Sequence, residues 1–252
     1  MAQLDSASDS DSEGPRFESA QVGQKIQVKR LGFFIDTTLI MWYNPFKKGG
    51  EKMFDKLHSG KIYDPFDAEI FKEQTKCLDR LYSYNKTRPT EPKRRAKLLK
   101  KMFAEIGEGC YIEPPFYANF GGRHIHFGNG IYCNFGCTFV DDTHIFVGDH
   151  TMFGPNVVVA TAAHPLAPQL REKGFQYNKP VYIGKNCWLG SGVIVLPGIS
   201  IGDGSVIGAG SVVTHDIPEG VVAVGNPCRA IREISTDLSP EEKALLAETK
   251  VK

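Results

Sequence analysis

A left-handed parallel β-helix, with an N-terminal helical cap and a short C-terminal helix around an all-β core, is the fold that this sequence predicts. Three observations support it. Six-residue units, each an apolar residue usually followed by glycine, repeat over 147–164 and again over 183–212. Residues 49–105 show the 3.6-residue apolar period of helices instead. Helix-start signals return at Ser239, which Pro240 and two glutamates follow.

The six-residue period indicates one short strand and one turn per unit, so that three units form a triangular coil. One branched aliphatic residue per unit points inward and stacks on its counterpart in the next coil. Weaker units occupy 106–117 and 127–144, and their phase slips by three residues between Tyr117 and Phe127 and by two at 145–146. We therefore expect short corner insertions there. Right-handed β-helices have longer, less even coils, which favours the left-handed form.

The helical cap is predicted over 49–105, with helices at 51–59, 67–84 and 91–105 that cover the otherwise open end of the β-helix. Phe71, Leu78 and Tyr82 lie on one side of the second helix. The basic run over 93–101 suggests either an anion site or a solvated helix face, and the second interpretation is favoured. The β-helix itself is predicted over 106–234, and a C-terminal helix and tail over 235–252.

Residues 1–20 are rich in Asp and Ser, which predicts a disordered acidic tail, and residues 21–48 form an N-terminal extension. The run at 31–43 is apolar but too short to span a membrane. With 30 basic and 29 acidic side chains, the charge supports neither nucleic-acid nor membrane binding. Six cysteines without CxxC spacing, and no visible signal peptide, predict a cytoplasmic protein.

Residues 161–182 interrupt the repeat with a long excursion, and long loops inserted in a compact repeat are usually functional. His164 lies at its first turn, followed by Pro165. An imidazole with a pKa near neutrality is suited to take a proton from an alcohol. His164 is therefore the candidate general base.

Several stretches resemble the maltose and galactoside O-acetyltransferase family. They are EKMFDKLHSGKIYD at 51–64, EPPFYANFGGRHIHFG at 113–128, NFGCTFVDD at 134–142, AAHP at 162–165 and the stretch at 207–234. The resemblance implies a homotrimer with active sites between subunits. It also implies transfer of acetyl from acetyl-CoA to a sugar hydroxyl, without a metal, with His164 as base and the Ser191 N–H as oxyanion donor.

The same resemblance assigns the binding residues. The acceptor sugar is expected to contact Asp64, Asn119, Tyr132, Asn134 and Asp142. Asn134 has a second interpretation, as a corner residue that satisfies the turn backbone. Acetyl-CoA is expected to contact Ser191, Ala209, Thr214, His215, Arg229 and Arg232. Arg229 has an alternative too, because it can close the last coil through a carbonyl.

Two other classes of function remain open. His126 and His144 are 18 residues apart, and His150 follows, so a zinc-dependent carbonic anhydrase is conceivable. A non-enzymatic hexapeptide scaffold is the second, although both His164 and Asp142 are present. Among acyltransferases, an amino sugar, an antibiotic or serine is an alternative acceptor.

Overall fold

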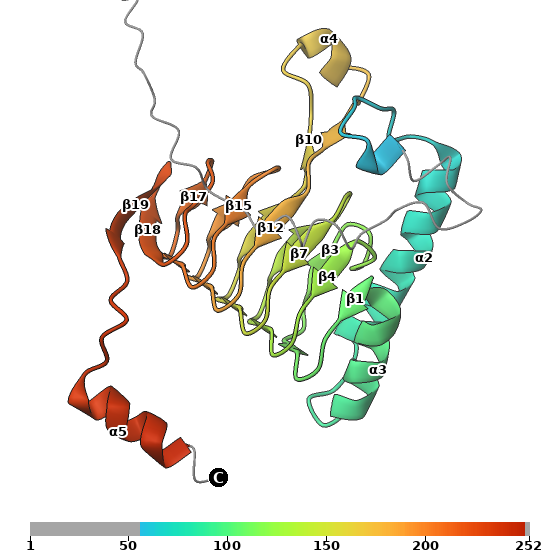
Figure 1. The fold of residues 1–252 in the computed structure, drawn as a ribbon. Coiled ribbons are helices and arrows are strands. Elements are labelled where there is room, and N and C mark those ends of the chain that lie inside the picture. Colours follow the sequence, from blue (N-terminus) through green and yellow to red (C-terminus); the bar gives the residue numbers. More distant parts are fainter. Residues whose placement is uncertain (1–55, 250–252) are drawn as a thin grey trace, which may run out of the picture. The chain divides into compact units, whose positions relative to one another are not determined.

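The computed structural model describes residues 56–249, which form a three-sided parallel β-helix with a helical cap at one end and a separate helix after the other (Figure 1). The predicted fold class is confirmed. The predicted tail at 1–20, the extension at 21–48 and the first residues of the first predicted helix lie outside the described residues.

The three walls of the β-helix are called faces 1, 2 and 3. Face 1 contains β1 (Glu105–Ile106), β4 (Ile125–Phe127), β7 (Ile145–Val147), β12 (Val181–Ile183) and β15 (Ser200–Ile201). Face 2 contains β2 (Tyr111–Ile112), β5 (Tyr132–Cys133), β8 (Met152–Phe153), β13 (Trp188–Leu189), β16 (Val206–Ile207), β18 (Val221–Gly225) and, antiparallel at its end, β19 (Cys228–Glu233). Face 3 contains β3 (Tyr117–Ala118), β6 (Thr138–Val140), β9 (Val158–Ala160), β14 (Ile194–Val195) and β17 (Val212–Val213).

The strand register confirms the predicted insertions. Ile183 pairs with Ile201, 18 residues later, as three six-residue units require. Ile106 pairs with Phe127, 21 residues later, and Phe127 pairs with Val147 after 20. The first insertion has three residues and the second has two. Each falls in a corner between face 3 and face 1, so the strands on either side keep their parallel hydrogen bonding.

The core is a column of apolar side chains along the axis of the β-helix, as the period predicts. On face 3, Phe139, Val159, Val195 and Val213 follow one another in register, and all are fully buried. Each inward residue therefore packs on its counterpart in the next coil. Burial of such side chains contributes about 1.5–3 kcal/mol each relative to exposure.

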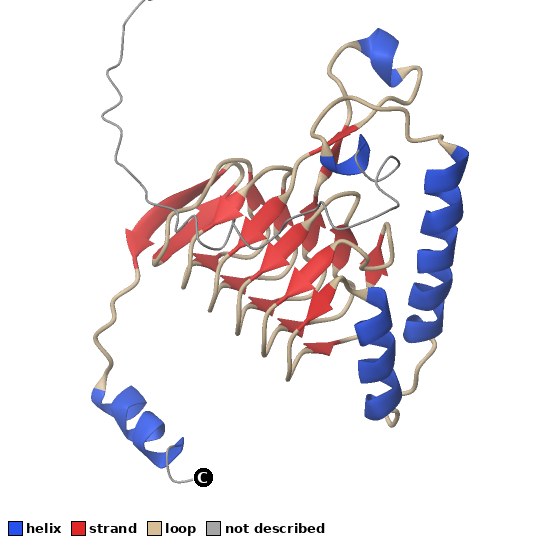
Figure 2. Ribbon diagram, turned by 45° about the vertical axis from the view of Figure 1, so that its right-hand side comes forward, coloured by secondary structure: helices blue, strands red, loops and turns tan. Residues whose placement is uncertain are grey.

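Among the described residues, the cap contains two long helices, α2 (Ala68–Asn85) and α3 (Pro92–Met102), and a short helical turn at 56–58 precedes them. Figure 2 shows α2 and α3 at the end of the β-helix that holds the first strands. Phe103, directly after α3, and Tyr84 of α2 join the core column. The Tyr84 hydroxyl donates to the Ile112 carbonyl over 2.5 Å. The cap therefore closes the first coil, and α3 ends three residues before its predicted end.

The apolar side of α2 that Phe71, Leu78 and Tyr82 form in the sequence is the exposed side of the helix. These side chains are 67%, 40% and 63% exposed, whereas Ile70 and Leu81 are buried. The helix has two apolar stripes one residue apart. The stripe that contains Ile70 and Leu81 is the one that packs against the rest of the protein.

The last described element is α5 (Pro240–Thr249). Ser239 caps it as predicted, because its Oγ accepts the Glu242 N–H while the Glu242 carboxylate accepts the Ser239 N–H. All six cysteines are free thiols. Across 56–249, helices of a length and apolarity sufficient to cross a membrane are absent.

Candidate active site

Two edges of the β-helix carry most of the predicted site residues. The first, here called the loop edge, consists of the corners from face 3 to face 1, at 119–124, 141–144, 161–180, 196–199 and 214–216. The second, here called the small-residue edge, consists of the corners from face 2 to face 3, at 134–137, 154–157, 190–193 and 208–211. Face 3 separates the two edges within one chain.

The excursion at 161–180 is a small hairpin of its own on the loop edge. β10 (Ala162–Ala163) pairs antiparallel with β11 (Tyr177–Asn178), and α4 (Pro168–Arg171) lies at the tip. Figure 1 shows the hairpin projecting from the body of the β-helix near β12. The wall resumes at Val181, so the last two residues of the predicted excursion belong to β12.

His164 follows β10 and is exposed. Its Nδ1 lies 2.8 Å from the carbonyl oxygen of Phe175 on the returning strand of the hairpin. Because a carbonyl only accepts, Nδ1 carries the hydrogen, and in the neutral ring Nε2 keeps the lone pair. The hairpin therefore presents a basic nitrogen at the loop edge.

Asp142 lies in the preceding corner of the same edge and is buried, with 4% of its surface exposed. Its Oδ2 accepts from Asn119 Nδ2 over 2.7 Å, and its Oδ1 accepts from Gln176 Nε2 over 2.8 Å. Burial raises the pKa of the Asp142 carboxyl, whereas these two hydrogen bonds and the charge of His164 lower it. The structure thus brings Asn119, Asp142 and His164 together.

Asp141, the residue before, has a different task. Its fully buried carboxylate accepts the backbone N–H groups of Phe120, Gly122 and His124 from the preceding coil. Burial raises its pKa to about 8, against the effect of those hydrogen bonds. The side chain holds the inserted corner that carries Asn119 in place.

Asp64 remains apart from this group. It is exposed, and its Oδ1 accepts the N–H of Phe66, which closes a local turn. Its neighbour Tyr63 is buried instead, and its hydroxyl accepts from Gln176 and Asn178 over 2.8 and 3.0 Å. Burial raises the pKa of Tyr63 to about 12. Sequence reasoning selected the acid and missed the phenol beside it.

Tyr132 and Asn134 lie on β5 and in the next corner, on the small-residue edge rather than with His164. The Asn134 Oδ1 accepts the N–H of Phe135 over 2.7 Å, which is the corner role that the sequence left open. Face 3 separates both residues from the base of their own chain.

Ser191 and Ala209 lie on the same small-residue edge, two coils and three coils further along than Asn134. Both are exposed. The glycines that follow them, Gly192 and Gly210, have φ of 68° and 70°, and nothing lies within 4 Å of where a Cβ would be. Around Ser191 and Ala209 this edge is open, which suits the predicted pantetheine arm of acetyl-CoA.

The remaining predicted coenzyme residues cluster at the last coil. Thr214 Oγ1 lies 2.7 Å and Arg229 Nη1 lies 3.3 Å from Nδ1 of His215. Arg229 also donates to the carbonyl of Cys228, the residue directly before it, so this hydrogen bond is local to the strand. Arg232 lies on the same strand, with a hydrogen bond to the carbonyl of Glu233. Arginines of this kind pair well with phosphates.

Four histidine rings pack where the cap meets face 1. His126 Nε2 lies 2.9 Å from His144 Nδ1, and the rings of His58 and His144 have centroids 4.3 Å apart. His124 also contacts His58, whereas His150 is exposed in another corner. Among residues 56–249, groups of three or more His, Cys, Asp or Glu side chains placed to hold a metal ion are absent.

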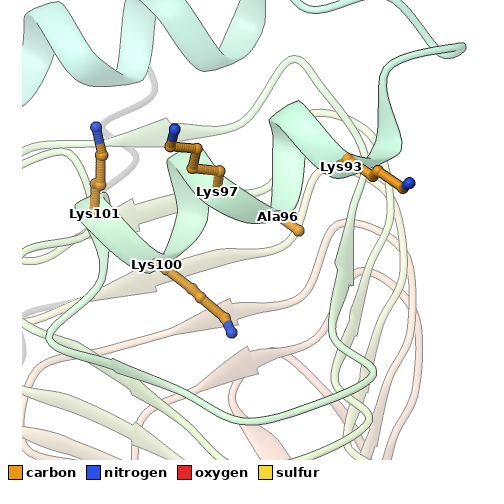
Figure 3. A pocket seen from close by; sticks show the side chains of 5 residues that line it. All are labelled: Lys93, Ala96, Lys97, Lys100 and Lys101. Carbon is orange, nitrogen blue, oxygen red and sulfur yellow. The ribbon is translucent and has the colours of Figure 1, made fainter.

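The basic run lies on the outer side of α3. Lys93, Lys97, Lys100 and Lys101 are all exposed. Lys97 and Lys101 point the same way, whereas Lys93 and Lys100 point away from them (Figure 3). The buried Arg95 instead donates to Thr87 Oγ1 over 3.0 Å. This arrangement is that of a solvated helix face.

A capped hexapeptide β-helix with a histidine hairpin on one edge defines the class of hexapeptide-repeat acetyltransferases. Two family models match the chain, the maltose acetyltransferase hexapeptide capping motif over residues 56–107 and the hexapeptide repeat of succinyl-transferase over residues 180–215. The first match covers the cap and the second covers regular coils on the far side of the hairpin.

Individual relatives narrow the class to one family. The galactoside O-acetyltransferase of Lactococcus lactis subsp. lactis strain IL1403 is 58% identical over 72% of this chain and 88% of its own length. The crystal structure of a maltose O-acetyltransferase from Clostridium difficile 630 is 43% identical over 72% and 97%, with a TM-score of 0.71. A galactoside acetyltransferase in complex with coenzyme A is 41% identical over 74% and 92%, also with a TM-score of 0.71. The chain belongs to the maltose and galactoside O-acetyltransferase family.

Proposed function

We propose that this chain transfers the acetyl group of acetyl-CoA to a hydroxyl of a mono- or oligosaccharide. The family supports the reaction, since relatives are named galactoside and maltose O-acetyltransferases and one structure holds coenzyme A. The observation that carries the proposal for this chain is the His164 imidazole, fixed through Nδ1 at the edge that also holds Asp142.

In the proposed step, His164 Nε2 takes the proton of the acceptor hydroxyl while the hydroxyl oxygen attacks the thioester carbonyl carbon. The carbon–oxygen bond forms, the carbon–sulfur bond breaks, and the imidazolium returns its proton to the departing thiolate. The Ser191 N–H stabilises the oxyanion, and loss of one such donor costs about 2.7–4 kcal/mol in other enzymes. Asp142, with Asn119 beside it, binds the acceptor hydroxyls.

The proposed enzyme is a homotrimer with each active site between two subunits. The separation of the two edges supports this assembly, because one chain keeps its base and its small-residue edge on opposite sides of face 3. A cyclic, head-to-tail interface joins the loop edge of one subunit to the small-residue edge of the next.

The proposal is tested by coenzyme A release from acetyl-CoA, measured with a thiol reagent. The acceptors are glucose, maltose, galactosides, amino sugars and serine, so that the alternative acceptors compete in one experiment. We expect sugar-dependent release. His164→Ala should lower kcat by about 10²–10⁴-fold, the usual contribution of general base catalysis, while acetyl-CoA still binds.

His150→Asn is the matched control, since His150 is exposed outside the site and its φ of 59° suits asparagine. It should keep wild-type kcat. Equal activity of His164→Ala and the wild-type protein would exclude the histidine mechanism. Absence of coenzyme binding in the wild type would favour a non-enzymatic scaffold.

A further inference from the structure

Gln176 lies at the centre of a buried polar network that joins three separate parts of the chain. It is 8% exposed, and its Nε2 lies 2.8 Å from Asp142 Oδ1, 2.8 Å from the Tyr63 hydroxyl and 2.9 Å from Asn178 Oδ1. The three partners belong to the loop edge, to the segment before α2 and to the hairpin itself. One side chain therefore links the cap, the β-helix and the excursion.

The contact with Asp142 fixes the orientation of its carboxylate. Gln176 holds Oδ1, and Asn119 holds Oδ2 over 2.7 Å. Both donors are neutral amides, so they orient the carboxylate without cancelling its charge. Each carboxylate oxygen can accept two hydrogen bonds and receives one here, so each keeps acceptor capacity for a ligand hydroxyl.

The backbone around Gln176 fixes the base as well. Gln176 and Tyr63 exchange two backbone hydrogen bonds, of 2.8 and 3.0 Å, which tie the returning strand of the hairpin to the cap. The preceding residue, Phe175, offers the carbonyl that accepts from His164 Nδ1. Two consecutive residues thus set the ring of His164 and the carboxylate of Asp142 relative to each other.

We propose that Gln176 is a positioning residue for acetyl transfer, whose amide aims the Asp142 carboxylate at the acceptor hydroxyl that His164 deprotonates. This inference rests on the proposed function. It predicts an effect on the acceptor rather than on acetyl-CoA, because the partners of Gln176 are Tyr63, Asp142 and Asn178, and none of them is a predicted coenzyme residue.

Two substitutions test the proposal through different readouts. Gln176→Leu removes the donor at nearly constant size and should lower kcat/KM for the acceptor about tenfold or more, the usual effect of a lost hydrogen bond to a charged group. The KM for acetyl-CoA should stay unchanged. Gln176→Glu places a second carboxylate at hydrogen-bond distance from Asp142, and the two share one proton near neutral pH.

In a plot of kcat/KM for the acceptor against pH, the acid limb is the part where activity falls as pH decreases. This limb should therefore move to higher pH in Gln176→Glu, and activity should recover as pH rises. Tyr63, Asp141 and His164 are the other titratable groups around Asp142, and they are the same in both proteins. A purely structural loss would lower activity at every pH and leave the limb in place.

Asn178→Ala is the matched control for loosening of the hairpin. Asn178 Nδ2 donates to the Leu57 carbonyl and the Tyr63 hydroxyl, so its loss weakens the same link without a contact to Asp142. Thermal melting and coenzyme A binding show which variants are folded, and the near-isosteric Gln176→Glu carries the test if Gln176→Leu does not fold.

The outcomes separate this inference from the proposed function. Suppose that the wild-type protein releases coenzyme A and that the Gln176 variants keep its kcat/KM for the acceptor and the position of its acid limb. That result would overturn the inference but not the proposed function. So would a loss in Asn178→Ala that equals the loss in Gln176→Leu. Lack of release by the wild-type protein with every acceptor would overturn both.

Discussion

The buried histidines between the cap and face 1 make the stability of this protein depend on pH. Burial, and after it the charge of His58, lowers the pKa of His124 to about 3. Burial also lowers the pKa of His144 to about 2, together with the charges of His58, His124 and His126. These rings are neutral in the folded protein at neutral pH.

The contribution of these histidines to the stability of the folded protein should therefore fall as the solution becomes acidic. In the unfolded chain each histidine takes up a proton near pH 6.5, whereas His144 in the folded state does not until about pH 2. The stabilising contribution is complete above pH 6.5 and falls below it by about 1.4 kcal/mol per pH unit for each histidine. Denaturant unfolding at several pH values measures the slope.

His144→Gln removes one of the titrating rings and should reduce that slope, while His150→Asn, at an exposed histidine, should leave it unchanged. The same slope in wild type and His144→Gln would show that the buried ring does not titrate as described.

Site residues whose partners lie far away in the sequence are the ones that could not be predicted from the sequence. His164 could be found because it stands in an interruption of the repeat. Gln176 stands in the same interruption, but its partners are 34 and 113 residues away, and an uncharged amide in a long loop carries no motif. Asp64 was chosen as the acid of the cap, whereas the structure buries the adjacent Tyr63.

At the scale of elements, α2 shows how a cap helix is anchored. Tyr84 near its C-terminal end is fully buried, and burial raises the pKa of its hydroxyl well above the usual value. The ring enters the core column, while the hydroxyl satisfies the carbonyl of Ile112 in the first coil. One side chain therefore joins the cap to the β-helix.

Tyr84→Phe should lower the free energy of unfolding by about 1 kcal/mol, since it removes one buried hydrogen bond and leaves the Ile112 carbonyl unsatisfied. Tyr84→Ala should cost about 3–5 kcal/mol through the cavity it creates. Tyr82→Ala, on the exposed side of the same helix, is the control and should change stability little. Calorimetric melting compares the three. A loss in Tyr82→Ala as large as in Tyr84→Ala would mean that the exposed side is the anchored one.

The existence and approximate bounds of α2 follow from its apolar period, but its buried side does not. Phe71, Leu78 and Tyr82 form one stripe of the helix, and Ile70, Cys77 and Leu81 form another one residue earlier. Both stripes have helical spacing. Which stripe is covered depends only on where the β-helix lies relative to the helix. That position is set by contacts between residues far apart in the sequence.

For the whole molecule, the distribution of the site over two edges makes the proposed assembly testable. His164→Ala removes the base on the loop edge, and Ala209→Trp fills the small-residue edge at an exposed position. In randomly mixed trimers of the two inactive variants, about one quarter of the interfaces join an intact base to an intact edge. We expect coenzyme A release to recover to about that fraction of the wild-type rate.

Sedimentation of the mixture before and after subunit exchange is the control for this complementation. Recovery should require exchange. Release that stays at the level of the two separate variants, in exchanged trimers, would place the whole active site within one subunit.

The architecture itself was the most predictable level. A six-residue period leaves few alternatives, and even the three-residue and two-residue slips were readable, because each extra residue shifts the whole pattern that follows it. The grouping of Asn119, Asp142 and His164 could follow only from the resemblance, since it depends on which corners share an edge.

The insertions of the described coils fall on the loop edge, where short ones hold Asn119 and Asp142 and a long one holds His164. The ladder resumes in register after each, so the length of an insert does not alter the walls. The β-helix thus separates the part that maintains the fold from the part that we propose binds the acceptor. Hairpins exchanged at 161–180 should change substrate preference while the coenzyme strip stays as it is, which makes this edge a natural place to redesign the enzyme.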